Sequence, residues 1–262
     1  MMKLARTPEF ERLRARLMLR AVLPTLAPLT TLDEQARRLA ARHRYALRIA
    51  TLSGCAVTLV CGPHGVLADP PDPGATLRLT FVSDRQANKV LGQAGLSVPI
   101  PGGHLTYLRY LGEFAQLAAR LEQVLNEPAS LKASEQALRA TLMFTHLLPA
   151  AVTELANHEA ISRQILEPYR DSSAEIVVPG GPHALIELGA DGVCRVRPRA
   201  EAPGKRADLS MRFSDLGTAI EAVDNRLDRL AALGSSRLVV EGLVPLADDL
   251  GRVMERAGAY LR

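Results

Sequence analysis

A short pattern that occurs twice restricts the fold of this 262-residue chain more than any other feature. Near the C-terminus, Leu209, Met211 and Phe213 alternate with polar residues, which is the period of a strand with one apolar face. Ser214 and Asp215 follow and offer side-chain oxygens to the first amides of a helix. The pattern therefore predicts a strand that leads directly into a helix.

A weaker copy of the pattern lies upstream. Residues 77–81 show the same alternation, and Ser83-Asp84 follow them. In each copy a glycine, Gly103 or Gly242, then precedes a leucine-rich helical stretch. Two matches in the same order, each preceded by runs typical of strands, predict an internal duplication.

Both halves are expected to have the same order of elements, with helices, three short strands, a fourth strand and its helix, a fifth strand and a last helix. The expected strands are 44–49, 55–59, 66–68 and 76–82 in the first half, and 175–178, 184–188, 193–197, 208–213 and 238–240 in the second. Short turns favour antiparallel pairing, because parallel strands need long crossovers. Pro99 and Pro101 make the fifth strand of the first half weak.

Apolar residues at intervals of three and four predict the helices. The expected helices are 9–23, 33–43, 84–92, 105–125, one capped by Ser134 with a kink or stop near Pro149, 216–230 with Leu230 on its apolar stripe, and a last helix that contains Leu246, Leu250 and Val253. Pro24 and Pro28 are expected to end the first of these helices.

Composition excludes several classes of protein. There is no apolar run of about 20 residues to span a membrane, and the N-terminus lacks the apolar centre of a signal peptide. Three cysteines are too few for a disulfide framework and fit a reducing compartment, so we expect a cytoplasmic protein. Hydrophobic residues make up 47% of the chain but aromatic residues only 4%, so the core must be aliphatic.

Positive charge is concentrated at the N-terminus. Residues 1–48 carry 11 basic and 4 acidic residues (+7), and the rest of the chain carries 32 − 11 = 21 basic and 28 − 4 = 24 acidic residues (−3). In the helix expected there, Phe10 and Leu13 fall on one face, and Arg12, Arg16 and Arg20 share another. Such a helix can lie on an anionic membrane, although an ordinary surface helix packed on the first domain is the favoured interpretation. Nucleic acid is a less favoured partner and we predict none, because the segment has no aromatic residues interleaved with the basic ones and no recognisable binding motif.

The sequence contains no recognisable catalytic or metal-binding constellation. Cys55 and Cys61 lack a second pair at zinc spacing, and His146 and His158 lack a ligand partner four residues away. Cys61 and His64 would form a catalytic pair only in a cleft with a further orienting group. We therefore predict no catalytic residue, no metal and no cofactor, and expect that the protein is not an enzyme.

The order of these elements resembles the sterol carrier protein 2 domain. The resemblance rests on residues 207–215 (Ala-Asp-Leu-Ser-Met-Arg-Phe-Ser-Asp), on 238–242 (Leu-Val-Val-Glu-Gly) and on the amphipathic helix that closes the chain. It covers residues 133–262 well and 32–126 less well. The family fold is a five-stranded sheet with helices around a hydrophobic tunnel, which takes sterols, fatty acyl chains or similar lipids without reacting with them.

The resemblance implies an α+β chain with two tandem sterol-carrier-like units, each a mainly antiparallel five-stranded sheet with helices on one face. The expected divisions are a basic segment at 1–30, a first domain at 31–127 and a second at 128–262. The expected function is non-catalytic binding or carriage of an apolar ligand, such as a lipid, a fatty acyl chain or a sterol- or isoprenoid-like molecule. The residues expected to line the second pocket are Leu209, Met211, Phe213, Val239, Leu246, Leu250 and Val253.

One alternative stays open. The apolar stripes could simply fill the core, in which case the chain would be an accessory or scaffold protein that docks on a membrane or on a lipid-pathway enzyme, with residues 1–30 as the contact. The sequence leaves open the ligand, the number of units that bind it, whether the units share a sheet, and the oligomeric state.

Overall fold

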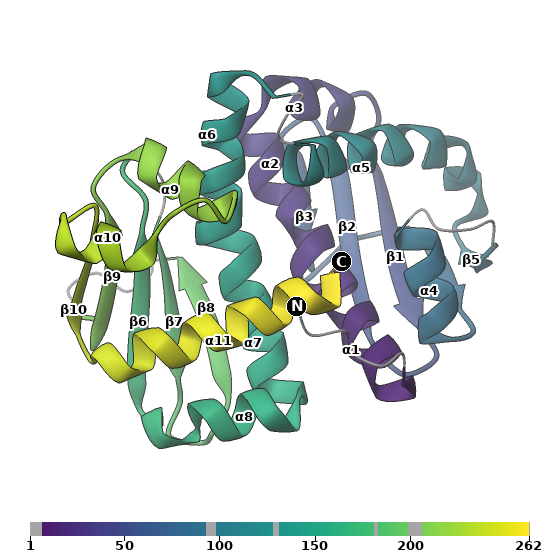
Figure 1. Ribbon diagram of the computed structural model, residues 1–262. Helices are drawn as coiled ribbons and strands as arrows, with labels where there is room; N and C mark the ends of the chain where they lie inside the picture. The colour runs from purple at the N-terminus through teal and green to yellow at the C-terminus, as the bar shows by residue number, and fades with distance from the viewer. Residues whose placement is uncertain (1–6, 93–97, 128–130, 181–182, 199–205, 262) are drawn as a thin grey trace. The chain divides into compact units, whose positions relative to one another are not determined.

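The computed structural model describes residues 7–92, 98–127, 131–180, 183–198 and 206–261 (Figure 1). The chain forms two compact units. Unit 1 comprises Met1–Gln123 and Ala259–Arg262, and unit 2 comprises Val124–Gly258.

Unit 1 contains a five-stranded sheet with the strand order β3-β2-β1-β4-β5. Its strands are β1 (Tyr45–Thr51), β2 (Ala56–Gly62), β3 (Gly65–Ala68), β4 (Thr76–Phe81) and β5 (Ile100–Gly103). β1 and β4 are parallel, and every other neighbouring pair is antiparallel. Ile100–Gly103 thus does form the fifth strand, because Pro101 occupies an edge strand where a missing amide is tolerated.

The sheet of unit 2 repeats this arrangement with the order β10-β9-β6-β7-β8. Its strands are β6 (Ser172–Val177), β7 (Ala184–Leu188), β8 (Cys194–Pro198), β9 (Leu209–Phe213) and β10 (Leu238–Gly242). β6 and β9 are parallel and the other pairs antiparallel. The predicted α+β class with two mainly antiparallel sheets is confirmed. The parallel pair was not predicted, since the chain returns past the three-stranded meander to the free edge of its first strand.

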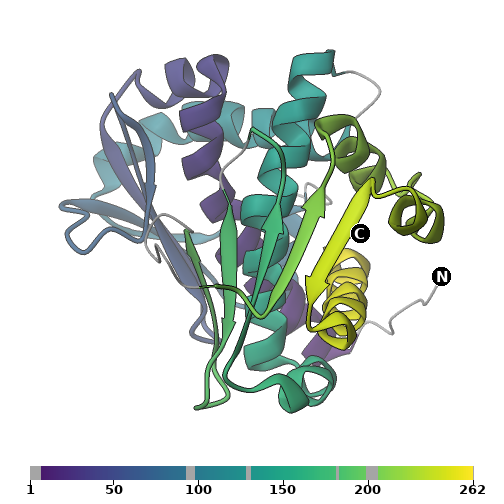
Figure 2. The ribbon, with the colours of Figure 1, turned by 90° about the vertical axis from the view of Figure 1, so that its left-hand side faces the viewer.

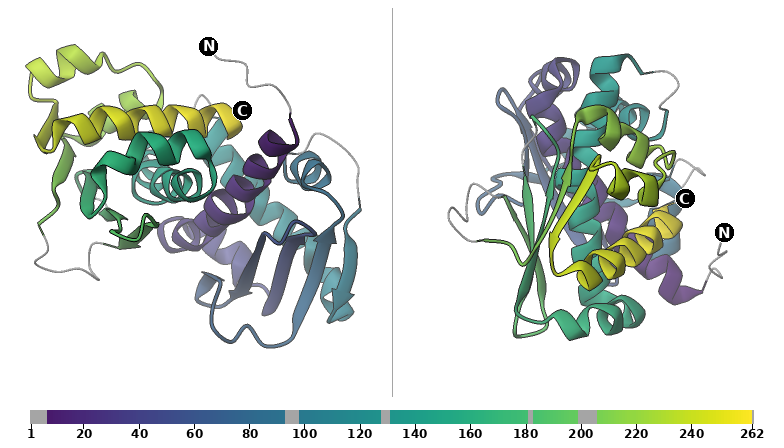
Figure 3. Two further views of the ribbon diagram at one scale, coloured as in Figure 1. Left: turned by 90° about the horizontal axis from the view of Figure 1, so that it is seen from below. Right: turned by 60° about the vertical axis from the view of Figure 1, so that its left-hand side comes forward.

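Helices cover one face of each sheet (Figures 1 and 3). Unit 1 has α1 (Pro8–Leu17), α2 (Leu26–Leu32), α3 (Glu34–Ala40), α4 (Asp84–Leu91), a 3₁₀ segment at Leu105–Tyr110 and α5 (Leu111–Asn126), whose last turn is grouped with unit 2. Unit 2 has α6 (Ala133–Leu142), α7 (Leu148–His158), α8 (Ala160–Leu166), a 3₁₀ turn at Glu167–Tyr169, α9 (Leu216–Val223), α10 (Arg229–Gly234) and α11 (Val244–Leu261).

Pro24 and Pro28 do not end the first helix, contrary to expectation. A π-helical turn at Met18–Val22 and a 3₁₀ turn at Leu23–Thr25 carry the chain from α1 into α2. These turns rearrange the hydrogen bonds around the proline that lacks an amide proton. Unit 2 has the same device, because a π-helical turn at Met143–Leu147 lies between α6 and α7, immediately before Leu148-Pro149.

Two further helix predictions were wrong. The helix expected at 216–230 is two helices, α9 and α10, and Leu230 is 82% exposed instead of lying on an apolar stripe. Asp228 caps α10 by accepting a hydrogen bond from the amide of Ala231 at 3.0 Å, which starts a new helix where periodicity alone predicted a continuous one. The cap of α6 is Lys132, so Ser134 lies inside the first turn.

The predicted starts of α4 and α9 are confirmed. The hydroxyl of Ser83 accepts a hydrogen bond from the amide of Gln86 at 3.1 Å, and the carboxylate of Asp215 accepts one from the amide of Thr218 at 2.7 Å. Each oxygen satisfies an amide that has no partner within its helix.

A buried ion pair recurs at the junction between the early helices of each unit. Asp33 joins α2 to α3 (φ −113°, ψ 116°) and lies 2.6 Å from Arg120 of α5. Glu159 joins α7 to α8 with nearly the same backbone (φ −107°, ψ 123°) and pairs with Arg256 of α11. Neither helix periodicity nor strand pattern indicated these pairs, and they strengthen the case for a duplication.

Candidate functional site

The candidate site is an apolar cluster in unit 2, built where α6, β6, β9 and α9 meet. The rings of Phe144 and Phe213 form its centre, with ring centroids 4.7 Å apart at an angle of 45°. Such a tilted pair is a favourable aromatic geometry. The buried members of the cluster are Ala140, Phe144, Ile176, Val178, Phe213 and Ala219.

Many of the hydrophobic side chains around this centre are only partly buried. They come from α6–α7, β9, α9, the segment after α9, β10 and α11, and they are Leu148, Met211, Leu216, Ile220, Ala222, Val223, Leu227, Leu238 and Met254. Figures 1 and 2 show α9 and α10 toward one end of β9 and β10 and α11 toward the other, on the same side of the sheet. The cluster thus combines a buried aromatic centre with a rim that water reaches.

Two of the predicted lining residues lie in this cluster, and four others are fully buried outside it. Phe213 is 5% exposed and Met211 is partly buried against the centre. Leu209, Leu246, Leu250 and Val253 are each 0% exposed, so they pack in the interior of unit 2.

Val239 lies on the other face of the sheet. It pairs with Arg212, whereas Leu238 pairs with Phe213 and Val240 with Met211. Residues that pair directly across antiparallel strands project from the same face. Leu238 and Val240 therefore take the positions for which Val239 was predicted, because the run of three apolar residues in β10 gave no alternation to fix its phase.

Sequence reasoning also missed residues that belong to the cluster. Phe144 and Leu148 come from α6–α7, and Ile220 and Met254 come from α9 and α11. Their helical periodicity was visible, but a helix stripe does not reveal which part of a sheet it covers.

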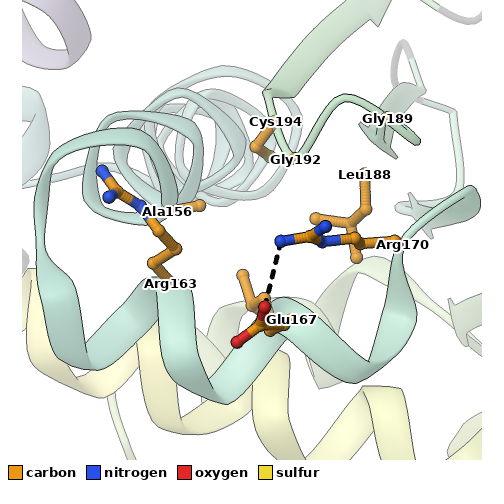
Figure 4. A pocket seen from close by; sticks show the side chains of 9 residues that line it. Ala156, Arg163, Glu167, Arg170, Leu188, Gly189, Gly192 and Cys194 are labelled. Carbon is orange, nitrogen blue, oxygen red and sulfur yellow. Dashed lines mark hydrogen bonds and ion pairs between the residues drawn. The ribbon is translucent and has the colours of Figure 1, made fainter.

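Two pockets formed by described residues of unit 2 contain none of the predicted lining residues. One is a depression of about 360 Å³ on the polar face of the sheet, lined by Glu175, Arg206, Ala207, Asp208, Ser210, Arg212, Glu241 and Gly242. The other, of about 40 Å³, lies between α8 and the β7–β8 turn (Figure 4), where Arg170 donates to Glu167 at 3.0 Å. That volume suits water rather than a ligand.

The structure separates the residues that could have formed a catalytic pair. Cys61 is 0% exposed in β2 and its thiol interacts with the Tyr45 hydroxyl, while His64 is exposed in the turn that follows. Burial raises the pKa of the Cys61 thiol to about 11, which keeps the thiol protonated and unreactive. Burial also lowers the pKa of His146. Among the described residues no group of three or more His, Cys, Asp or Glu side chains could hold a metal ion.

Comparison with solved structures finds sterol carrier protein 2 domains. The solution structure of such a domain from Helicoverpa armigera is 15% identical, with 42% of this chain and 84% of that domain covered and a TM-score of 0.31. A crystal structure of sterol carrier protein 2 is 20% identical, with 46% and 98% covered and a TM-score of 0.32. A sec-alkylsulfatase from Pseudomonas sp. is 15% identical, but only 28% of that chain is covered, with 56% of this chain and a TM-score of 0.28.

No protein-family model and no curated protein matches this chain. These identities and TM-scores are too low to support an argument about function, so the description of the chain rests on its own sheet topology. The chain is a tandem pair of α+β units with the same strand order and the same parallel pair in both.

No helix in the described part of the chain combines the length and hydropathy required to cross a bilayer.

Proposed function

We propose that unit 2 binds an apolar ligand, such as a fatty acyl chain or a sterol- or isoprenoid-like lipid, and carries it without chemical change. The observation that carries this proposal is the rim of partly buried hydrophobic side chains around the Phe144–Phe213 centre. A core that only stabilised the fold would gain more by closing, since each Å² of apolar surface removed from water contributes about 25 cal/mol.

The ligand would lie between α9, α11 and the inner face of β9 and β10. Met211 and Leu238 would contact it from the sheet, and Ile220 and Met254 would contact it from the helices. Methionine and unbranched apolar chains adapt to ligands of varied shape. The fully buried Leu246, Leu250 and Val253 would support this surface from below and take part in binding only if α11 shifts.

A chain-length series tests the proposal. Fatty acids of increasing length, with a fluorescent reporter, are titrated into the purified full-length protein. Each methylene that enters the site contributes about 0.8 kcal/mol, so Kd should fall about fourfold for each methylene until the site is full. No binding at any length, together with no lipid retained in native mass spectrometry, would refute the proposal.

Variants place the site. Ile220→Asn introduces a polar group into the rim and should weaken binding, and Met211→Asn should do the same from the sheet. The matched control is Leu230→Asn, because Leu230 is 82% exposed in the neighbouring helix α10. If the control weakens binding as much as the two rim variants, the ligand does not lie where we propose. Circular dichroism checks that each variant is folded.

A further inference from the structure

The two sheets differ in the charge of the face that the helices leave uncovered. In unit 1 the five strands contain two arginines and no Asp or Glu. In unit 2 the five strands contain three of each sign, which are Arg195, Arg197 and Arg212 with Glu175, Glu187 and Glu241. The acidic residues of unit 2 balance its basic ones, as in the 3.0 Å ion pair of Arg197 with Glu187.

The two arginines of the first sheet are neighbours. Arg48 of β1 is in register with Arg78 of β4, and both side chains are exposed. Arg44 precedes β1 with the same alternation, and its Cγ lies 3.8 Å from the position that a Cβ on Gly62 would occupy. Like charges directly opposite one another on a sheet repel. The five strands of unit 1 contain no carboxylate that could offset this repulsion, but a bound anion would do so.

The nearest strand end supplies no free countercharge. Asp69 follows β3, but its carboxylate already binds the guanidinium of Arg20 and the amide of Thr58. Arg48 donates a hydrogen bond to the hydroxyl of Thr58 at 3.4 Å, and this neutral partner does not offset its charge.

Aliphatic side chains project from the same face at its two edges. Leu67 of β3 pairs with Val60 and is 59% exposed, and Ile100 of β5 pairs with Thr80 and is 57% exposed. Arg44, Arg48, Arg78, Leu67 and Ile100 together are called the outer face of unit 1. It combines basic groups at its centre with exposed apolar groups at both edges.

We propose that the outer face of unit 1 docks on an anionic lipid bilayer. The arginines would contact acidic headgroups, and Leu67 and Ile100 would enter the headgroup–acyl boundary. Nucleic acid is the weaker candidate, because three arginines neutralise few phosphates and exposed aliphatic side chains offer no stacking platform. The helix expected at 9–23 is a weaker membrane contact, since Phe10, Leu13 and Leu17 of its apolar face are buried.

Vesicle co-sedimentation tests this docking. Full-length protein is mixed with vesicles of phosphatidylcholine alone, or with one third of it replaced by phosphatidylglycerol. We expect binding to the anionic vesicles only, and weaker binding as salt rises. Each arginine near such a surface changes the partition coefficient about fivefold, so R48Q/R78Q should reduce it about 25-fold.

Two matched variants make the result specific. R195Q/R197Q removes the same charge from the corresponding face of unit 2 and should bind vesicles like the wild type. R48K/R78K keeps the charge and should retain binding, which separates charge from damage to the sheet.

Equal binding to neutral and anionic vesicles, or wild-type binding by R48Q/R78Q, would overturn the proposal. So would binding to an RNA homopolymer with none to anionic vesicles. The docking does not depend on the proposed lipid site in unit 2, so the Ile220→Asn variant should still bind vesicles.

Discussion

Replacing Gly242 by alanine should destabilise unit 2 severely. Gly242 ends β10 with φ +93°, a conformation that L side chains rarely adopt. A Cβ built there would lie 2.0 Å from the carbonyl oxygen of Asp208. The same oxygen accepts a hydrogen bond from the amide of Leu243 at 2.8 Å, so it cannot move away without breaking the connection between β10 and α11.

The magnitude follows from two contributions. Backbone strain at a non-glycine residue with positive φ costs about 1–3 kcal/mol. Displacing the strand by enough to accommodate the Cβ adds the loss of a backbone hydrogen bond, about 1 kcal/mol. We therefore expect Gly242→Ala to lose about 2–4 kcal/mol of unfolding free energy, measured by urea denaturation.

Gly251→Ala is the matched control. Gly251 lies inside α11, and a Cβ there would meet nothing within 4 Å. Alanine in a helix interior is favoured over glycine by about 1 kcal/mol, so this variant should be slightly more stable than the wild type. If Gly242→Ala costs less than about 1 kcal/mol, or if both variants lose the same amount, the reasoning about the left-handed glycine is wrong.

Three further predictions concern buried groups. Arg256→Met should lower the unfolding free energy in urea by about 3–5 kcal/mol, because the side chain of Glu159, which is 3% exposed, loses its guanidinium partner. Adding Glu159→Met should recover most of this loss, and no recovery would contradict the pairing. Because burial lowers the pKa of His146 from 6.5, the unfolded chain binds a proton that the folded chain does not. The contribution of His146 to stability should therefore be complete above pH 6.5 and decrease as the pH falls below that value. The urea midpoint of His146→Gln should depend less on pH. Cys61, with its raised pKa, should resist iodoacetamide in the folded protein and react in urea, and rapid alkylation of the folded protein would contradict its burial.

The sequence predicted those parts of the fold that depend on local patterns. The alternation at 209–213 and 77–81 and the caps at Ser83 and Asp215 all reflect interactions over a few residues. These signals are strong because each satisfies a backbone amide or a steric requirement nearby.

The remaining features depend on contacts between distant segments. The register of β10, which places Leu238 rather than Val239 against Phe213, is set by its partner strand. The parallel pairing of β1 with β4 requires knowing which edge of the meander stays free. The division of 216–230 into two helices follows from the cap at Asp228, whereas the periodicity of the apolar residues predicted one continuous helix. Consequently Met211 and Phe213 of β9 could be predicted as members of the cluster, and the residues contributed by α7, α9 and α11 could not.

The duplication itself indicates where the two units have diverged. Positions that hold the fold correspond in both, since Asp33 and Glu159 occupy the same helix junction and each binds an arginine of the last helix. Residues on the uncovered sheet faces differ between the units. Arg48 of unit 1 and Glu175 of unit 2 occupy the same position, because each follows the residue that pairs with the first leucine of the fourth strand. A fold that needed a particular charge there would have the same sign in both copies. The charge of the uncovered face is therefore free to differ between the units, and in unit 1 it can serve the membrane docking that we propose.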